Sequence, residues 1–161
     1  MKSARMMTLL VLTGAFSAAA LAQFRKPEDS VKYRQGVMQL MDFHLYRQIG
    51  SMVNGRIPFD AKLAADNAAL LATLAPLPWS AFPPGTDSGK SESGKSESGK
   101  SDAKPAIWTE QAKFKDLSEK MQAQVGRLQA ASKTGDLEAL RTAYRATTNT
   151  CKACHDAYTS Q

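Results

Sequence analysis

The chain has 161 residues, of which 43% are hydrophobic and 22% charged, and its formal net charge is +6 at neutral pH. A chain of this length suits one domain. Its lysines and arginines are spread along predicted helical faces and are not interleaved with aromatic residues, so the positive charge is ordinary solvated surface. We therefore expect no nucleic-acid partner.

The N-terminus has the pattern of a secretory signal peptide. Two basic residues precede an apolar run from Met6 to about Ala20, and Ala20-Leu21-Ala22 has the small-x-small form of a cleavage site. The run is interrupted by polar residues and is shorter than the roughly 20 residues of a membrane-spanning helix. We expect a signal peptide over residues 1–22, a mature domain over residues 23–161 with no membrane attachment, and location in the periplasm of a Gram-negative source.

Helix start and stop signals divide the mature chain into four helices. Proline and acidic residues open the first, an aspartate caps the second and fourth, and proline opens the third. The predicted helices run from Pro27 to about Val53, from Asp60 to before Pro76, from Pro105 to near Gly135, and from Asp136 onward. This order predicts an all-α, antiparallel four-helix bundle.

Apolar side chains recur at three- or four-residue steps on each helix and mark its core-facing side. On the first helix these are Val31, Val37, Met38, Leu40, Met41, Leu45, Ile49 and Met52. On the second they are Leu63, Ala64, Asn67, Leu70, Leu71 and Leu74, and on the third Ile107, Phe114, Leu117, Met121, Val125 and Leu128. The proline-rich stretch 77–85 carries Trp79 and Phe82, which are costly to leave in water, so we expect it to fold back onto the core.

Residues 88–102 repeat the pattern Ser-Gly-Lys-Ser-Glu with no apolar side chain. Such a segment has nothing to bury and is predicted to be a disordered, solvated loop. The repeated Gly-Lys-Ser lacks the preceding strand and first glycine of a phosphate-binding loop, which disfavours that interpretation.

The two cysteines of the chain lie in Cys151-Lys152-Ala153-Cys154-His155, a C-x-x-C-H motif typical of covalent haem attachment. On a helix Cys154 and His155 lie roughly 60° and 40° to either side of Cys151, so the three side chains share one face. That face continues the core-facing side of the fourth helix. We expect one haem c per chain, held inside the bundle.

Three other interpretations of the motif are weaker. A thioredoxin-like pair needs a βαβ setting, and no segment is predicted to be a strand. A zinc site needs a fourth ligand, and the other histidine, His44, is more than a hundred residues away in the sequence. A disulfide across C-x-x-C closes too short a loop to constrain the chain much.

The mature chain resembles the cytochrome c prime family, the class II c-type cytochromes. The resemblance rests on Gln23-Phe24-Arg25-Lys26-Pro27-Glu28-Asp29, Tyr33-Arg34-Gln35, Leu77-Pro78-Trp79 with Phe82, Gly85-Thr86, Ile107-Trp108 and Cys151-Lys152-Ala153-Cys154-His155-Asp156. These pieces follow the family's order and spacing apart from the inserted repeat.

The resemblance implies a role for eight residues of the cofactor site. It implies thioether anchors at Cys151 and Cys154, an axial iron ligand at His155, and propionate neighbours at Arg34, Gln35 and Asp102. It also implies that Met38 lies over the distal face of the haem and that Phe82 forms a second wall. For Arg34 the alternative is a solvated helix charge. Thr159 departs from the family, because many relatives have a basic residue four positions after the histidine.

The family implies a haem protein that binds small gases such as nitric oxide and carbon monoxide at an open iron, and often a homodimer. It could also carry electrons to and from redox partner proteins. The alternative is a six-coordinate, low-spin electron-transfer cytochrome with Met38 as the sixth ligand, because some low-spin relatives place a ligating methionine there. We expect no enzymatic activity, since the sequence places no distal acid or base. His44 lies about 240° around the helix from Met38 and cannot face the same iron, so we expect a surface or dimer-edge role for it.

Overall fold

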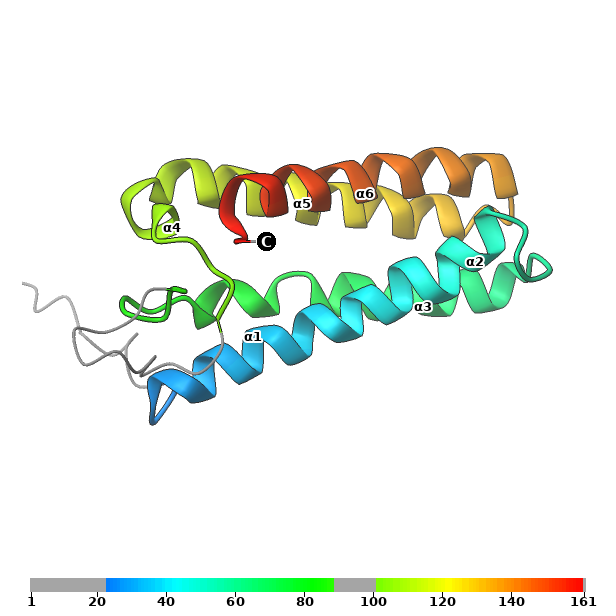
Figure 1. Cartoon of the computed structure of the whole chain (residues 1–161). Helices are drawn as coiled ribbons and strands as arrows, with labels where there is room; N and C mark the ends of the chain where they lie inside the picture. The colour runs from blue at the N-terminus through cyan, green and yellow to red at the C-terminus, as the bar shows by residue number, and fades with distance from the viewer. Residues whose placement is uncertain (1–22, 89–100, 161) are drawn as a thin grey trace, which may run out of the picture.

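The computed structural model describes residues 23–88 and 101–160, so the predicted signal peptide and most of the repeat lie outside the described residues. The helices are α1 (Pro27–Asp42), η2 (Phe43–Ile49), α2 (Gly50–Val53), α3 (Ala61–Leu74), η3 (Leu77–Ala81), α4 (Ala106–Thr109), α5 (Gln111–Ser132) and α6 (Leu137–Tyr158). In Figure 1 the rod formed by α1 and α2 lies beside α3, and α5 and α6 lie side by side as a second layer. The predicted all-α, four-helix bundle is confirmed.

The first predicted helix is continuous, but its middle is a π-helix. Over Phe43–Ile49 the turns widen, and the Gly50 N–H donates to the carbonyl of Leu45, five residues earlier. Most of the predicted stripe is buried, including Val31, Leu45 and Met52. Leu40 is 50% exposed, which corrects the prediction. Leu40 lies about 140° around the helix from Leu45, on the opposite side.

The second helix begins where the sequence predicts. The Asp60 Oδ1 accepts the Leu63 N–H at 2.9 Å and caps α3. Its buried side chains are Ala64, Asn67, Ala68 and Leu71, whereas Leu63 and Leu70 are 38% and 50% exposed. Leu63 and Leu70 were expected in the core and are not there. Each lies one residue, about 100°, around the helix from the buried line.

The third predicted helix is broken at Glu110, where φ and ψ are −113° and 39°. The short α4 carries the buried Ile107, and α5 carries Met121, Val125 and Leu128 into the core. The break turns Glu110 toward the end of α6, where its Oε2 accepts the hydroxyl of Tyr158 at 2.9 Å. The end of α6 is thereby attached to the start of α5.

The last helix is capped as the sequence predicts. The Asp136 Oδ1 accepts the N–H groups of Glu138 and Ala139 at 2.8 and 3.3 Å. Leu140, Tyr144, Thr147 and Tyr158 are buried along one side of α6. In the part of the chain that the structure describes, no helix is both long and apolar enough to cross a membrane.

Candidate haem site

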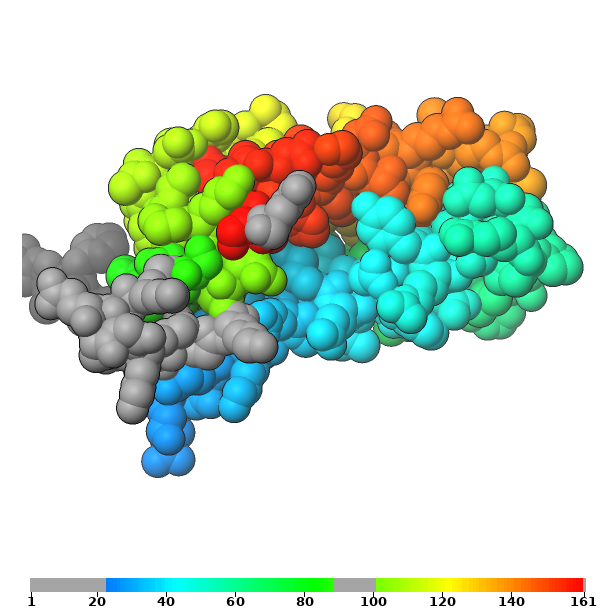
Figure 2. All heavy atoms as spheres, in the orientation of Figure 1, coloured from blue at the N-terminus to red at the C-terminus, as the bar shows by residue number. Residues whose placement is uncertain are grey.

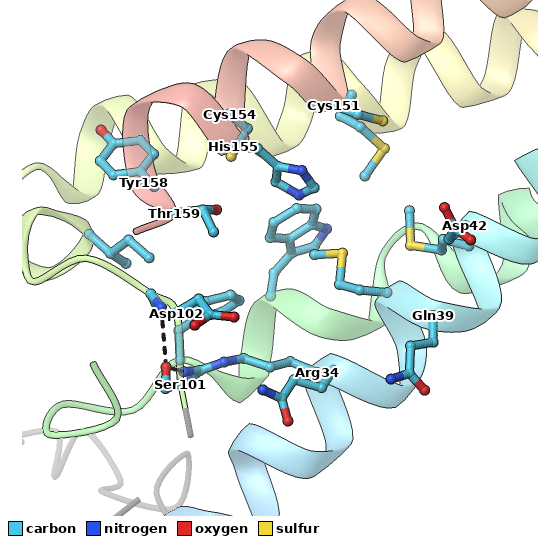
Figure 3. Close-up of a pocket in the computed structure, with 18 of the residues that line it drawn as sticks. Arg34, Gln39, Asp42, Ser101, Asp102, Cys151, Cys154, His155, Tyr158 and Thr159 are labelled. Atoms are coloured by element: carbon cyan, nitrogen blue, oxygen red, sulfur yellow. Dashed lines mark hydrogen bonds between the residues drawn. The ribbon is translucent and has the colours of Figure 1, made fainter. Parts of the chain in front are cut away.

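A cavity of about 520 Å³ separates the C-terminal half of α6 from α1. Figure 2 shows the face on which the end of α6, the segment after residue 100 and α1 meet. The motif side chains Cys151, Cys154 and His155 form one wall. The prediction that these three side chains share one face of the helix is confirmed. Figure 3 shows the His155 ring pointing from α6 into the space above α1.

The two cysteines are free and half-buried. Burial raises the pKa of the Cys151 thiol, and burial followed by the proximity of Cys151 raises the pKa of the Cys154 thiol to about 11. Redox-active C-x-x-C pairs instead have lowered thiol pKa values, since the thiolate is the nucleophile. Both cysteines also lie toward the C-terminal end of α6 and not at a helix N-terminus, so the site does not fit a thioredoxin-like function.

Opposite the motif the cavity wall is mainly apolar, although Gln39 and Asp42 also line the cavity from the first helix. Met38, Met41 and Leu45 line it from the first helix, so both methionines reach the cavity although helical phase favoured Met38. Met41 is the more buried, with 7% of its surface exposed. A cavity with two thiols and an imidazole on one side and mainly apolar side chains on the other fits a haem attached through C-x-x-C-H.

The proline-rich stretch folds back onto the core, as expected. The rings of Trp79 and Phe82 stack at 6.4 Å, and the edge of Phe114 meets the Phe82 ring at 5.0 Å between centroids. The Trp79 Nε1–H donates to the Ala75 carbonyl at 2.7 Å, which satisfies the polar end of the indole. All three rings line one end of the cavity, and Phe82 is where the resemblance implied a wall.

The rim of the cavity is polar and includes Arg34, Gln35 and Asp102. Arg34 is neither a solvated charge nor open to the solvent, because only 4% of its surface is exposed. Its guanidinium donates hydrogen bonds to Ala81, Thr86 and Ser101. Burial lowers the Arg34 pKa to about 10, against the opposing effect of the Asp87 charge.

Ser88, Ser101 and Asp102 were predicted to be disordered, and the structure shows them hydrogen-bonded, which corrects the prediction for these three residues. Ser101 is 8% exposed, and the Ser88 N–H donates to the Ala103 carbonyl at 2.8 Å. Asp102 accepts the Ser160 N–H on its carbonyl at 2.8 Å. The prediction was wrong here because Ser101 belongs to the polar repeat but accepts a hydrogen bond from the distant Arg34, and the local sequence gives no sign of that partner.

His44 lies outside the cavity wall. Its Nδ1 is 2.7 Å from the Oδ1 of the buried Asn67, whose Nδ2 donates to the Leu63 carbonyl at 2.8 Å. His44 therefore joins the first helix to α3. The residue is half-buried, and a role at the edge of a dimer stays a prediction.

Sequence reasoning missed several residues of the cavity wall. Tyr46, Asp42, Ile107, Phe114, Met121 and Tyr158 all line the cavity without having been assigned to it. Four of these were missed although they lie on predicted apolar faces or beside the motif. Asp42 is an exposed carboxylate that pairs with Arg47 Nε at 3.1 Å. Following the apolar stripe of each predicted helix as far as the level of the C-x-x-C-H motif would have identified the apolar residues of this set.

A four-helix bundle with C-x-x-C-H on its last helix and an apolar wall opposite defines a class of c-type haem proteins. The family model described as cytochrome C′ matches residues 29–159. Cytochrome c′ of Rubrivivax gelatinosus is 43% identical over 136 residues, which are 84% of this chain and 98% of the relative. Cytochrome c-554 of Cereibacter sphaeroides is 34% identical over 135 residues, which are 83% of this chain and 95% of the relative.

Solved structures agree with these sequence relationships. A nitric oxide complex of a cytochrome c prime mutant from Alcaligenes xylosoxidans has a TM-score of 0.75 at 42% identity and covers 86% of this chain and 99% of its own. Cytochrome c′ from Rubrivivax gelatinosus has a TM-score of 0.74 at 41% identity and covers 86% of this chain and 100% of its own. The chain belongs to the cytochrome c′ family, and its cofactor is covalently attached haem c.

Proposed function

We propose that this protein binds a small gas, nitric oxide or carbon monoxide, at an open haem iron position, and that it also exchanges electrons with redox partner proteins. The observation that carries the proposal is the arrangement of the cavity: His155 enters from α6, and the facing wall of Met38, Met41 and Leu45 is apolar. When bound, the haem supplies an iron that takes a diatomic ligand or changes oxidation state.

The residues of the chain have distinct roles in this proposal. Cys151 and Cys154 would hold the haem covalently through their sulfur atoms, and the His155 imidazole would bind its iron. The apolar wall excludes water from the opposite side and favours a small uncharged ligand. Gln35 and the exposed Asp102 lie at the polar rim, where the charged propionate end of the haem would stay in contact with water.

The role is non-enzymatic in this proposal. Among the described residues that line the cavity, His155 is the one histidine, and Asp42 and Asp102 are exposed carboxylates at the rim. Neither carboxylate has the burial that tunes a general acid or base. A solved relative described as a nitric oxide complex supports gas binding over coordination by Met38.

Optical spectra of the purified protein in both oxidation states, with and without carbon monoxide, test the proposal. We expect a high-spin ferrous spectrum that shifts on addition of carbon monoxide. A low-spin ferrous spectrum that carbon monoxide leaves unaltered would contradict it. Mass under denaturing conditions should equal the chain from Gln23 plus one haem, and the Cys151→Ala, Cys154→Ala double variant serves as the control that loses the attachment.

Export and assembly complete the proposal. Cleavage after Ala22 delivers residues 23–161 to the periplasm, and two copies associate as a homodimer. Leu40 and Phe43 on the first helix, and Leu63 and Leu70 on α3, are 38–50% exposed and would be covered by a second copy. Cell fractionation tests the location, and sedimentation equilibrium tests the dimer. A monomer at all concentrations would contradict the assembly without affecting the haem proposal.

A further inference from the structure

The two Nη groups of Arg34 donate their hydrogen bonds to neutral groups of the chain. Its Nη1 donates to the Ala81 carbonyl and the Thr86 Oγ1, both at 2.8 Å. Its Nη2 donates to the Thr86 carbonyl and to the Ser101 Oγ, the latter at 2.7 Å. The guanidinium carbon lies 4.4 Å from the centroid of the Phe82 ring. Arg34 therefore holds both ends of the repeat segment against α1.

These contacts continue from Ser101 to the end of the histidine helix. The Ser101 Oγ accepts the Ala103 N–H at 3.2 Å. The Lys104 N–H donates to the Tyr158 carbonyl at 2.9 Å, and the Ser160 N–H donates to the Asp102 carbonyl at 2.8 Å. An antiparallel bridge joins Ala103 to Thr159. A continuous set of hydrogen bonds thus connects α1 with the residues that follow His155.

We propose that Arg34 is a positioning residue, which holds the last turn of α6, and with it His155, at a fixed place opposite α1. The inference rests on the proposed haem site, because it concerns the wall of that cavity. Arg34 and Met38 are four residues apart on α1, and both line the cavity together with Ser101, Asp102, Thr159 and His155. Figure 3 shows Arg34 beside Ser101 and Asp102, with the end of α6 above them.

This role differs from the propionate contact that the resemblance implied. A guanidinium has five N–H donors, two on each Nη and one on Nε. The four Nη donors all serve Ala81, Thr86 and Ser101, so at most the Nε–H remains for a propionate. A propionate partner requires a positive charge, whereas the observed contacts require a planar guanidinium whose N–H donors point in fixed directions. Lysine provides the charge but not this arrangement of donors.

Native-state hydrogen exchange of the holoprotein separates the two roles. Arg34→Lys and Arg34→Met should each speed exchange of the Lys104 and Ser160 amides at least tenfold. The matched control Lys32→Met removes an exposed charge from the same helix and should change these rates less than twofold. If Arg34→Lys exchanges like the wild type, charge alone suffices and the positioning role is overturned.

Ser101→Ala tests the same connection without changing Arg34, and it carries the test if the Arg34 variants do not fold. It should speed exchange of the Lys104 amide at least threefold and increase the rate of carbon monoxide association with the ferrous protein at least twofold. Unaltered exchange in Ser101→Ala would overturn the inference. Hydrogen exchange reports on the backbone amides and does not require the haem. If the wild-type chain carried no covalent haem, the proposed function would be contradicted, whereas the effect of Ser101→Ala on exchange would still test the role of Arg34.

Discussion

The hydroxyl oxygen of Tyr144 on α6 lies 2.7 Å from the point that a Cβ atom would occupy on Gly50, the first residue of α2. The Tyr144 Cζ is 3.2 Å from that point, and the Leu45 carbonyl oxygen, which accepts the Gly50 N–H in the π-helix, is 3.3 Å from it. Glycine at this position therefore lets the tyrosine ring pack directly on the backbone at the end of the π-helix.

Gly50→Ala should lower the free energy of unfolding by about 1–3 kcal/mol, because the added methyl group overpacks a filled contact. Urea unfolding monitored by circular dichroism measures the change. Gly36→Ala is the matched control on α1, where a Cβ would meet nothing within 4 Å. It should leave stability unaltered or raise it by about 0.5–1 kcal/mol. Equal stability of both variants would show that Tyr144 moves aside without cost.

Deleting residues 91–98 should leave the fold and the haem spectrum unaltered. The segments on either side are held independently, since the Ser88 N–H donates to the Ala103 carbonyl and Ser101 binds Arg34. Loop length affects closure entropy only weakly, by about 0.6 kcal/mol per doubling, so we expect a small gain in stability. Thermal unfolding and the absorption spectrum measure both effects. Loss of haem incorporation would reveal a role for the repeat itself.

Met38→Ala should leave the coordination of the iron unaltered and speed gas binding. In the proposed function Met38 only fills the wall opposite His155, so its removal enlarges the space available to a ligand. Absorption spectra report the spin state, and flash photolysis measures the carbon monoxide association rate. A wild type that is low-spin and becomes high-spin in Met38→Ala would instead identify Met38 as a ligand.

Tyr46→Phe should make stability less sensitive to alkaline pH. Burial, with smaller contributions from neighbouring groups, raises the pKa of Tyr46 to about 12. In the unfolded chain the Tyr46 hydroxyl ionises near pH 10, which is a lower pH than in the folded chain. The contribution of the protonated Tyr46 to the free energy of unfolding is therefore fully present below about pH 10 and is lost as the pH rises toward 12. Urea unfolding at several pH values tests this, and an unchanged alkaline slope in Tyr46→Phe would contradict it.

Local signals located the ends of the helices well. Asp60 and Asp136 were predicted caps, and each accepts backbone N–H groups of the first turn that follows it. Capping depends on residues within three positions, so the sequence is sufficient to predict it. The break at Glu110 was not predicted, and the partner of its side chain, Tyr158, lies 48 residues away, where no local pattern can indicate it.

Apolar periodicity was less reliable for the exact buried face. Leu40, Leu63 and Leu70 fit broad apolar stripes, yet all three lie on the outside of the bundle. A helix with apolar residues over a wide arc has several possible inward faces, and only its neighbours select one. The small residues Ala64 and Ala68 are fully buried on α3 instead.

The sequence by itself determined the cofactor chemistry, because Cys151, Cys154 and His155 lie within five residues and one helix fixes their common face. Only the tertiary structure decided what encloses the haem. Arg34 reaches acceptors 47, 52 and 67 residues further along the chain, and no local pattern encodes such pairs. A buried guanidinium is stable only where folding brings enough acceptors around it, so its role follows from the packed bundle.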